Sequence, residues 1–559
     1  MTTASYAQGP NKPALLEQTI GHCLDEAAGN HPDIEALVSR HQDLRYTYAE
    51  FQEETDRVAR ALMAFGIQHG ERVGIWAPNC AEWCITQFAT AKMGAILVNI
   101  NPAYRTSELE YALTHSGVST LITQGAFKTS NYVEMLCELE PGLIEAEPAA
   151  FQAQRMPQLK HVICLDADRS TPGMWTWEDL REQASRVSVE QLAARRQELD
   201  RNDVINIQYT SGTTGRTKGA SLTHRNILNN GFFVAEGMNI QPGDGIVIPV
   251  PLYHCFGMVM GNLGAITHGA TIIYPNDGFD PQLTLEAVQA EQANALYGVP
   301  TMFIAELELP DFDRFDLSSL RTGIMAGSNC PVQTMKDVIE YMNMEDVTVC
   351  YGQTETSPVT VQTLPDSPFD KRVATAGTVH PHVEIKLVDP GTGKTVPRNT
   401  TGEYCTRGYS VMRGYWNNDE ATAEAIDADG WMHSGDLATM DDDGYVAITG
   451  RIKEMIVRGG ENIYPREIEE HLNTHPDLSD AYVFGVPDNK YGEEVAVWAR
   501  RRADSQVDEE GVREFCRVSI AHYKVPRYVK FVDDFPMTVT GKIQKFRMRE
   551  MATKALGLE

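Results

Sequence analysis

YTSGTTGRTKG, Tyr209 to Gly219, brings hydroxyls, glycines and one lysine together directly after a run rich in β-branched residues. Glycine lets a backbone approach an anion closely, while hydroxyl and ammonium groups donate hydrogen bonds to its oxygens. Residues 204 to 209 predict a strand, and α/β folds bind their ligands where strands end. The stretch therefore predicts an α/β fold with a phosphate-binding loop, whose candidate ligands are Thr210, Ser211, Gly212, Thr213, Thr214, Gly215 and Lys218.

The spacing and composition of this loop bear on two other interpretations. A Walker loop places serine or threonine directly after its lysine, whereas Gly219 follows Lys218, so the P-loop NTPase interpretation fails. A flexible, solvated linker has the same composition as the loop. The embedded lysine and the preceding strand favour a phosphate site, although these residues alone leave the linker open.

The length and composition of the chain exclude several classes of protein. Its 559 residues exceed what one hydrophobic core organises, so two or more domains are expected. The formal charge of -29 argues against nucleic acid and anionic membranes as general partners, because their phosphates would be repelled. No run approaches the roughly 20 apolar residues of a membrane span, and the N-terminal residues lack an apolar signal region. We therefore expect a cytoplasmic protein without an integral membrane segment.

The ten cysteines are scattered and mostly flanked by apolar residues, so reduced, buried thiols are expected. Cys80 and Cys84 share a helical spacing, but no second Cys/His pair completes a zinc site beside them. Core packing explains this pair better than metal binding.

The pattern of the chain predicts a large domain followed by a small one. Helical and strand periods alternate from about 46 to 123 and from 221 to 362, which indicates mainly parallel sheets layered with helices. Strands are expected at 73–76, 96–98, 246–250, 271–274 and 347–350, and the stretch 139–203 is expected to be a peripheral helical connection. After 375, short β-like segments predict a β-rich subdomain. We expect one domain over 1–450, a boundary at 451–453, and a compact α+β domain over 454–559.

Further candidate ligands follow later strands. Tyr351, Gly352, Gln353, Thr354 and Glu355 form YGQTE, in which the aromatic ring would stack on a purine and the carboxylate would hold Mg²⁺. HSGD, His433 to Asp436, places a carboxylate at an expected strand end, where it would accept ribose hydroxyls, and Arg451 adds a cation. Each stretch taken alone is equally an ordinary turn.

The last part of the acidic chain is basic, which predicts a surface that would close over an anion. Lys542 lies in a Thr/Gly turn, a setting in which lysine is usually only solvated. A solvated charged helix is the alternative for the terminal members of the group, which comprises Lys524, Arg527, Lys530, Lys542, Lys545, Arg547, Arg549 and Lys554.

The order of these stretches from 46 to 550 resembles the acyl-adenylate-forming enzymes, and medium-chain fatty acyl-CoA synthetases most of all. YTSGTTGRTKG resembles the phosphate loop of that family, and YHCFG, which contains His254, resembles its aromatic gate. AGSNCP, which contains Gly327 and Ser328, resembles with YGQTE the adenine and magnesium segments. HSGD resembles the ribose motif. GRIKEMIVRGGENIYPREIE resembles the hinge and thiol tunnel, with Lys453, Gly459 and Gly460, and TGKIQK resembles the motif of a catalytic lysine, Lys542.

The resemblance implies an ATP-dependent acyl-CoA synthetase. A carboxylic acid would react with ATP to give acyl-AMP and pyrophosphate, and coenzyme A would then accept the acyl group. The implied catalytic residues are Lys542, Glu355 with Mg²⁺, and His254 as a gate, and the small C-terminal domain would rotate about Lys453. Two residues depart from the family pattern. Thr217 stands where the family commonly has proline, which implies a more mobile loop without loss of a phosphate ligand. Asn329, beside the expected acyl pocket, leaves the acyl chain length open.

Two alternatives to this function remain at the level of sequence. An acyl- or aryl-AMP ligase for another carboxylic acid or for a carrier-protein acceptor shares the first step. A non-catalytic nucleotide-binding protein shares the fold, although intact Glu355, Asp436, Arg451 and Lys542 argue against it.

Overall fold

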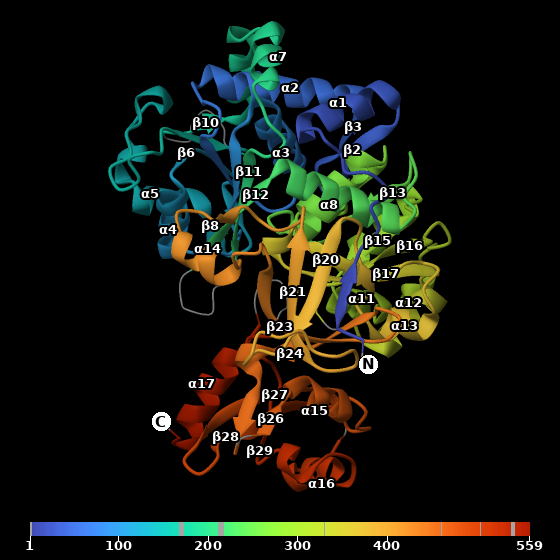
Figure 1. Cartoon of the computed structure of the whole chain (residues 1–559). Helices are drawn as coiled ribbons and strands as arrows, with labels where there is room; N and C mark the ends of the chain where they lie inside the picture. Colours follow the sequence, from blue (N-terminus) through green and yellow to red (C-terminus); the bar gives the residue numbers. More distant parts are fainter. Residues whose placement is uncertain are drawn as a thin grey trace. The chain divides into compact units, whose positions relative to one another are not determined.

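The computed structural model describes residues 3–166, 173–210, 217–328, 330–459, 461–503, 505–537 and 543–558 (Figure 1). It confirms the α/β class, with large sheets layered with helices. The chain divides into two compact units, each of which is described by itself. The smaller unit comprises Met1–Ala7, Ile385–Cys405 and His433–Glu559, and the larger unit comprises Gln8–Glu384 and Thr406–Met432.

One sheet of the larger unit carries the predicted phosphate loop. Among the described residues it has eight strands in the order β10-β9-β6-β4-β5-β11-β12-β22. The strands from β10 to β11 run parallel, whereas β12 and β22 are antiparallel to their neighbours. Their bounds are β4 Arg72–Trp76, β5 Ile96–Asn99, β6 Val118–Thr123, β9 His161–Cys164, β10 Trp175–Thr176, β11 Val204–Thr210, β12 Lys218–Thr223 and β22 Gly414–Tyr415.

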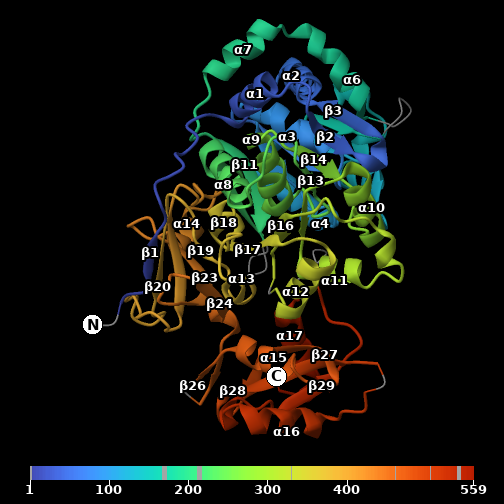
Figure 2. The same ribbon diagram turned by 90° about the vertical axis from the view of Figure 1, so that its right-hand side faces the viewer.

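Helices cover this sheet because their apolar stripes need a buried partner. The helix α3 (Ala81–Met93) is buried nearly all round, and Phe88 packs edge-on against Phe51 of α2 (Tyr48–Ala64) with ring centroids 5.5 Å apart. The helices α6 (Trp177–Glu182) and α7 (Val189–Gln197) arch over α2 (Figure 2). The other helices near this sheet are α1 Ile20–Asn30, α4 Thr106–Ser116, α5 Tyr132–Leu139 and α14 Asp419–Ala425.

A second sheet of the larger unit has, in the described part of the chain, the order β19-β18-β17-β16-β15-β13-β14-β2-β3. The bounds are β2 Glu35–Ser39, β3 Leu44–Thr47, β13 Gly245–Val247, β14 Thr271–Tyr274, β15 Ala295–Gly298, β16 Thr322–Met325, β17 Asp346–Gly352, β18 Val359–Gln362 and β19 Thr378–Val379. The helices that accompany it are α8 His224–Gly237, α9 Gly264–Thr267, α10 Pro281–Glu291, α11 Pro300–Leu307, α12 Val332–Tyr341 and α13 Phe369–Ala374.

Two expectations for the larger unit were wrong in detail. The strand expected at 246–250 ends at Val247, because Pro249 and Pro251 have no N–H to donate to a ladder. The stretch 139–203, expected to be helical connection, also contributes the strands β9 and β10 at the edge of the first sheet.

The smaller unit holds most of one sheet and all of a second. Most of the sheet β1-β20-β21-β23-β24 belongs to it, with bounds β1 Tyr6–Gln8, β20 Val383–Val388, β21 Gly402–Gly408, β23 Met432–Met440 and β24 Val446–Arg451. The second sheet, β26-β25-β28-β27 with β29 paired to β28, packs with three helices around its own apolar core. These elements are β25 Ile456–Arg458, β26 Glu461–Ile463, β27 Leu478–Asp488, β28 Gly492–Arg501, β29 Tyr528–Phe531, α15 Pro465–Leu472, α16 Glu509–Ser519 and α17 Lys545–Leu556.

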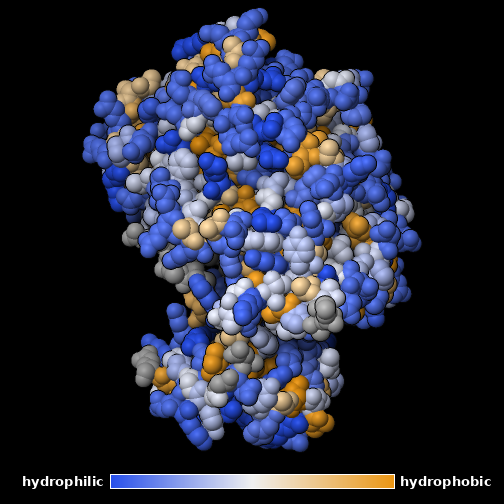
Figure 3. Space-filling model, viewed as in Figure 1, coloured by the Kyte–Doolittle hydropathy of each residue, from blue (hydrophilic) through white to orange (hydrophobic). Residues whose placement is uncertain are grey.

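The surface and the cysteines agree with the composition. The face drawn in Figure 3 is mainly hydrophilic, with small, separate apolar areas. None of the ten cysteines, all of which are among the described residues, forms a disulfide; eight are buried, while Cys137 and Cys330 are partly exposed. In the described part of the chain, no helix is both long and apolar enough to cross a bilayer.

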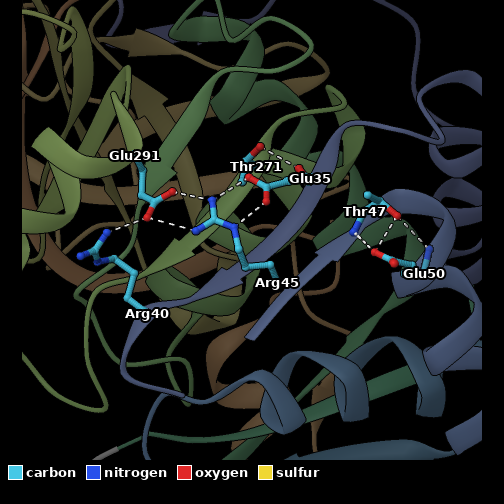
Figure 4. Close-up of polar contacts among 7 residues, drawn as sticks. All are labelled: Glu35, Arg40, Arg45, Thr47, Glu50, Thr271 and Glu291. Atoms are coloured by element: carbon cyan, nitrogen blue, oxygen red, sulfur yellow. Dashed lines mark hydrogen bonds and ion pairs between the residues drawn. The ribbon is translucent and has the colours of Figure 1, made fainter. Parts of the chain in front are cut away.

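An ion-pair network closes the β3 edge of the second sheet (Figure 4). Glu291, the last residue of α10, binds Arg40 and Arg45 at 2.6 Å each, and Arg45 also binds Glu35 at 2.6 Å. Nearby, Thr47 and Glu50 form the capping box that begins α2. Burial opposes ionisation of Glu291, but its bonds to Arg45 and Arg40 outweigh burial and lower its pKa.

Glu291→Gln should lower the free energy of unfolding by about 1–3 kcal/mol at neutral pH, because two guanidinium groups lose a charged acceptor. The lowered pKa means that this stabilisation is fully present above the unfolded-state pKa of about 4.3 and is lost as the pH falls through the folded-state value. Denaturation curves of both proteins across this range measure the difference.

Glu286→Gln is the matched control, since Glu286 also lies on α10 but forms an exposed pair with Arg314 at 3.4 Å. Its effect should stay below about 0.5 kcal/mol. Equal effects of the two substitutions, or a Glu291→Gln effect that does not shrink in acid, would contradict the role of the network.

Candidate active site

The two ends of the predicted phosphate loop are paired strands. The strand β11 runs parallel to β5 and antiparallel to β12, with Thr210 opposite Lys218. Thr217, the unusual residue of the loop, accepts a hydrogen bond from the hydroxyl of Tyr111 at its carbonyl oxygen, at 3.2 Å. The structure therefore defines both ends of the loop, while five of its predicted ligands lie outside the described residues: Ser211, Gly212, Thr213, Thr214 and Gly215.

Three predicted residues meet around the ring of Tyr415. The hydroxyl of Tyr415 donates to Glu355 Oε1 at 2.9 Å, and Thr210 Oγ1 lies 3.3 Å from the same oxygen. Lys218 Nζ lies 4.9 Å from the centre of the Tyr415 ring, a cation–π distance. A carboxylate, a hydroxyl and an ammonium group from separate parts of the sequence thus lie together.

Tyr415 is a functional candidate that the sequence analysis missed. Burial raises its pKa, and the neighbouring charge of Glu355 adds to the effect, so Tyr415 remains a hydrogen-bond donor at neutral pH. It stands in VMRGYW, residues 411–416, but its position in that stretch gave no reason to pair it with a carboxylate 60 residues away.

A tight turn presents Glu355. Tyr351 and Gly352 end β17, and the N–H of Gln353 donates to the carbonyl of Pro358 at 3.0 Å. Thr354 and Glu355 lie in the 3₁₀ turn that follows, and the carbonyl of Glu355 accepts from Met412 N at 2.8 Å. A Cβ on Gly352 would lie 1.7 Å from the carbonyl oxygen of Pro358, so only glycine fits here.

Gly327 and Ser328 follow the end of the neighbouring strand. The strand β16 is parallel to β15 and to β17, so the carboxyl ends of all three strands lie at one edge of the sheet. Gly327 has a φ of +90°, which favours glycine. Gly327 and Ser328 therefore lie at the same edge of the sheet as Tyr351. Asn329 lies outside the described residues.

His254 lies in a constrained segment. Its ring is 4.0 Å from that of Tyr253, whose carbonyl accepts from Asn99 Nδ2 at 3.1 Å. Burial raises the pKa of the next residue, Cys255, and the negative charge of Glu355 adds to it, so this segment lies within electrostatic reach of Glu355. A π-helix over Phe256–Leu263, a geometry frequent at functional sites, follows directly.

Buried polar side chains hold this π-helix. Gln208 of β11 bonds the sulfurs of Cys255 and Met258 at 3.2 and 3.0 Å, and Gln87 of α3 donates to the carbonyl of Met258 at 3.0 Å. Asn262 donates to Gln87 at 2.8 Å and accepts from Tyr274 at 2.7 Å. A satisfied buried network of this kind orients its members rigidly.

Asp436 and Arg451 pair within the smaller unit. They lie opposite each other on β23 and β24, and Arg451 Nε is 3.0 Å from Asp436 Oδ1. The Asp436 side chain is 6% exposed, whereas that of Arg451 is 57% exposed. The expectation of a strand end was wrong: β23 continues to Met440, because the buried Leu437, Ala438 and Met440 extend its pairing with β24.

The remaining predicted residues of the smaller unit are only partly described. Lys453 lies in a 3₁₀ turn, Ile452–Glu454, directly after β24. Gly459 follows β25 with a φ of +62°, and its N–H donates to the carbonyl of Tyr491 at 2.8 Å. Gly460 and Lys542 lie outside the described residues.

The basic C-terminal group is neutralised in part, because four of its eight members bind carboxylates within the described residues. Lys545 binds Glu469 at 2.7 Å, Arg527 binds Asp488 at 3.0 Å, and Arg549 binds Glu493 at 2.6 Å. Lys524 binds Glu467. These basic residues bind acidic residues on other elements. A count of charged residues over the last part of the sequence alone misses these partners.

Two family models match most of the chain. The model of the AMP-binding enzyme matches residues 24–416, and that of the AMP-binding enzyme C-terminal domain matches residues 467–542. A putative acyl-CoA synthetase of Bacillus subtilis, YngI, is 48% identical over 97% of this chain and 99% of its own length. The medium-chain acyl-CoA ligase ACSF2, mitochondrial, of Danio rerio is 43% identical over 100% of this chain and 92% of its own length.

Solved structures are similar in fold to this chain over nearly its whole length. ATP-bound MatB from Rhodopseudomonas palustris is 27% identical with a TM-score of 0.82, over 96% of this chain and 99% of that one. The anthranilate CoA ligase AuaEII in complex with anthranoyl-AMP is 25% identical with a TM-score of 0.83, over 98% and 99%.

Gly352→Ala should lower the thermal midpoint by several degrees, corresponding to about 1–3 kcal/mol, because the added Cβ overlaps the carbonyl of Pro358. Differential scanning calorimetry measures the shift. Gly142→Ala is the control, since a Cβ there meets no atom within 4 Å. Matching midpoints for the two variants would show that the 352–358 turn adapts and that glycine is not required.

Proposed function

Because this chain belongs to the AMP-binding enzyme family and is an acyl-CoA synthetase, we propose that it activates a medium-chain fatty acid with ATP and Mg²⁺ and transfers the acyl group to coenzyme A. The observation that carries the assignment of the ATP site is the meeting of Thr210, Lys218 and Glu355 around Tyr415. Hydroxyl and ammonium groups beside one carboxylate suit a phosphate chain with its cation.

The donor set at Glu355 fits Mg²⁺. A carboxylate with hydroxyl oxygens beside it offers the hard oxygen ligands that Mg²⁺ prefers together with substrate phosphates. Glu355 would hold the ion, and Tyr415 would orient the carboxylate through its hydrogen bond. The bound ion would supply charge neutralisation at the phosphates.

In the proposed first half-reaction, the carboxylate of the acid attacks the α-phosphate of ATP and pyrophosphate leaves. Both reactants are anions, so cations must bring them together and stabilise the charge that develops. Lys542 would act at the α-phosphate, and Lys218 with the loop residues 210–215 would bind the departing pyrophosphate. For the nucleoside, we propose stacking of adenine on Tyr351 beside Gly327, Ser328 and residues 352–354, with ribose on Asp436 and Arg451.

In the proposed second half-reaction, the thiol of coenzyme A attacks acyl-AMP. A thiol with a pKa of about 8.5 is a few per cent thiolate at neutral pH, so the activated ester needs no dedicated base. His254 would gate the thiol channel, and Gly459 and Gly460 would border it. We propose that residues 451–453, with Lys453 as the hinge, separate a domain over 1–450 from a mobile one over 454–559 that rotates between the two steps.

The choice of a medium-chain acid rests on named relatives and on apolar residues. Several vertebrate relatives are named medium-chain acyl-CoA ligases, whereas one structural neighbour is an anthranilate ligase. Gly298, Val299 and Met302, at and after the end of β15, are apolar residues that would suit an aliphatic chain. The proposed role is in fatty acid metabolism and the proposed location is the cytoplasm, whereas those vertebrate relatives are named mitochondrial.

A panel of carboxylic acids should give the largest kcat/KM with chains of about six to ten carbons, because an apolar pocket gains about 0.8 kcal/mol per buried methylene. Pyrophosphate release and acyl-CoA formation are measured in parallel. A preference for aryl acids would replace the substrate proposal. Pyrophosphate release without thioester would replace coenzyme A by another acceptor.

Lys542→Ala should slow adenylation roughly a hundredfold, or about 3 kcal/mol, while sparing thioester formation from added acyl-AMP. Rapid-quench assays of each half-reaction measure the two rates. Lys554→Ala is the control, because Lys554 is an exposed lysine on α17. An equal loss in both half-reactions would remove Lys542 from the first step.

In the same assays, Lys453→Pro should alter at least one half-reaction, and wild-type rates in both would exclude the hinge.

A further inference from the structure

Glu403, Cys405 and His433 form a cluster outside the proposed catalytic residues. Glu403 and Cys405 stand two residues apart on β21, so their side chains share one face of the sheet. His433 lies on β23, the neighbouring strand (Figure 1). Its Nδ1 is 3.0 Å from Glu403 Oε2 and 3.4 Å from Cys405 Sγ, and the three ligand atoms lie within 4.8 Å of one another.

These distances suit a shared ion. A tetrahedral zinc ion with Zn–S of about 2.3 Å and Zn–N or Zn–O of about 2.1 Å separates its ligands by roughly 3.4–3.6 Å. The present separations need only small side-chain adjustments to reach these values. We propose that Glu403, Cys405 and His433 bind a divalent transition-metal ion of the Zn²⁺ class.

The chemistry of the three ligands selects the ion. A thiolate and an imidazole favour Zn²⁺ and Co²⁺ over Mg²⁺, which prefers oxygen. The thiolate and the carboxylate carry two negative charges, which balance one divalent cation. This site is therefore separate in chemistry from the proposed Mg²⁺ position at Glu355.

Burial leaves the cluster accessible from one side. Cys405 is buried and the Glu403 side chain is 13% exposed, whereas the His433 side chain is 32% exposed. Three protein ligands with one exposed side match a site whose fourth position is taken by water. An ion can thus enter past His433 and displace the proton of Cys405 to solvent.

Backbone contacts already orient two of the ligands. Glu403 Oε1 accepts from the N–H of Gly435 at 3.2 Å, which leaves Oε2 directed at His433. The hydroxyl of Ser434 donates to the carbonyl of Tyr404 at 2.6 Å and ties β23 to β21. Supporting bonds of this kind fix ligand direction in metal sites. Because Ser434 Oγ also accepts from Asp436 N at 3.0 Å, the bound ion would stiffen the segment that carries Asp436.

Titration of the full-length, EDTA-treated protein with Co²⁺ tests the site. One equivalent should produce a thiolate-to-Co²⁺ band in the near ultraviolet together with visible bands of four-coordinate Co²⁺, and one equivalent of Zn²⁺ should remove both. Cys405→Ala should abolish the near-ultraviolet band. His433→Gln, which keeps a hydrogen-bond donor for Glu403 and changes a more exposed residue, should weaken binding at least about tenfold.

His268→Gln is the matched control. His268 Nε2 lies 3.2 Å from Glu236 Oε2, so these residues form a similar histidine–glutamate pair. Neither residue belongs to the Glu403–Cys405–His433 cluster found among the described residues, so this variant should bind Co²⁺ like the wild type. Circular dichroism checks that each variant is folded. If Cys405→Ala does not fold, the Co²⁺ affinity of His433→Gln tests the proposal, and wild-type affinity would overturn it. Absence of the thiolate band at one equivalent, its persistence in folded Cys405→Ala, or full displacement by millimolar Mg²⁺ would each overturn the proposal.

Discussion

The pairing of β12 on both of its edges is the constraint on which the candidate site of the larger unit depends. On one side β11 places Thr210 opposite Lys218, and on the other β22 places Tyr415 opposite Ala220. Glu355 joins this arrangement through its bonds to Tyr415 and Thr210. A shift of either register by one residue would turn these side chains to the opposite face of the sheet. The backbone hydrogen bonds of β12 to β11 and β22 thus set the positions of the residues for which phosphate binding is proposed.

The strand β11 also connects two regions of that unit. The side chains of Asn206, Gln208 and Thr210 lie on one face of β11, since side chains two residues apart in a strand point the same way. Gln208 bonds the π-helix behind His254, while Thr210 bonds Glu355. Polar groups in so buried a strand are tolerated because each finds a partner. The position of His254 and that of Glu355 therefore depend on neighbouring residues of the same strand.

Local sequence predicted the elements well and their partners poorly. The fold class, β11 and β17 follow from short-range patterns of apolar residues and glycine, which are visible along the chain. The bond from Tyr415 to Glu355 spans 60 residues, and no local pattern marks it. The strand β9 was missed because a strand of four residues carries little periodicity. The basic C-terminal group failed for a related reason: its partners, such as Glu469 and Glu493, lie on other elements.

Pairing of several C-terminal cations with carboxylates has a consequence for how an anionic substrate is captured. With Lys545, Arg527 and Arg549 each held by a carboxylate and a formal charge of -29 on the chain, the net charge of the protein repels polyphosphates at long range. Approach of ATP is then a diffusional encounter against a repulsive field, which physiological salt screens within about 8 Å. Discrimination must arise from short-range contacts made after arrival, so affinity is governed by how slowly the nucleotide leaves.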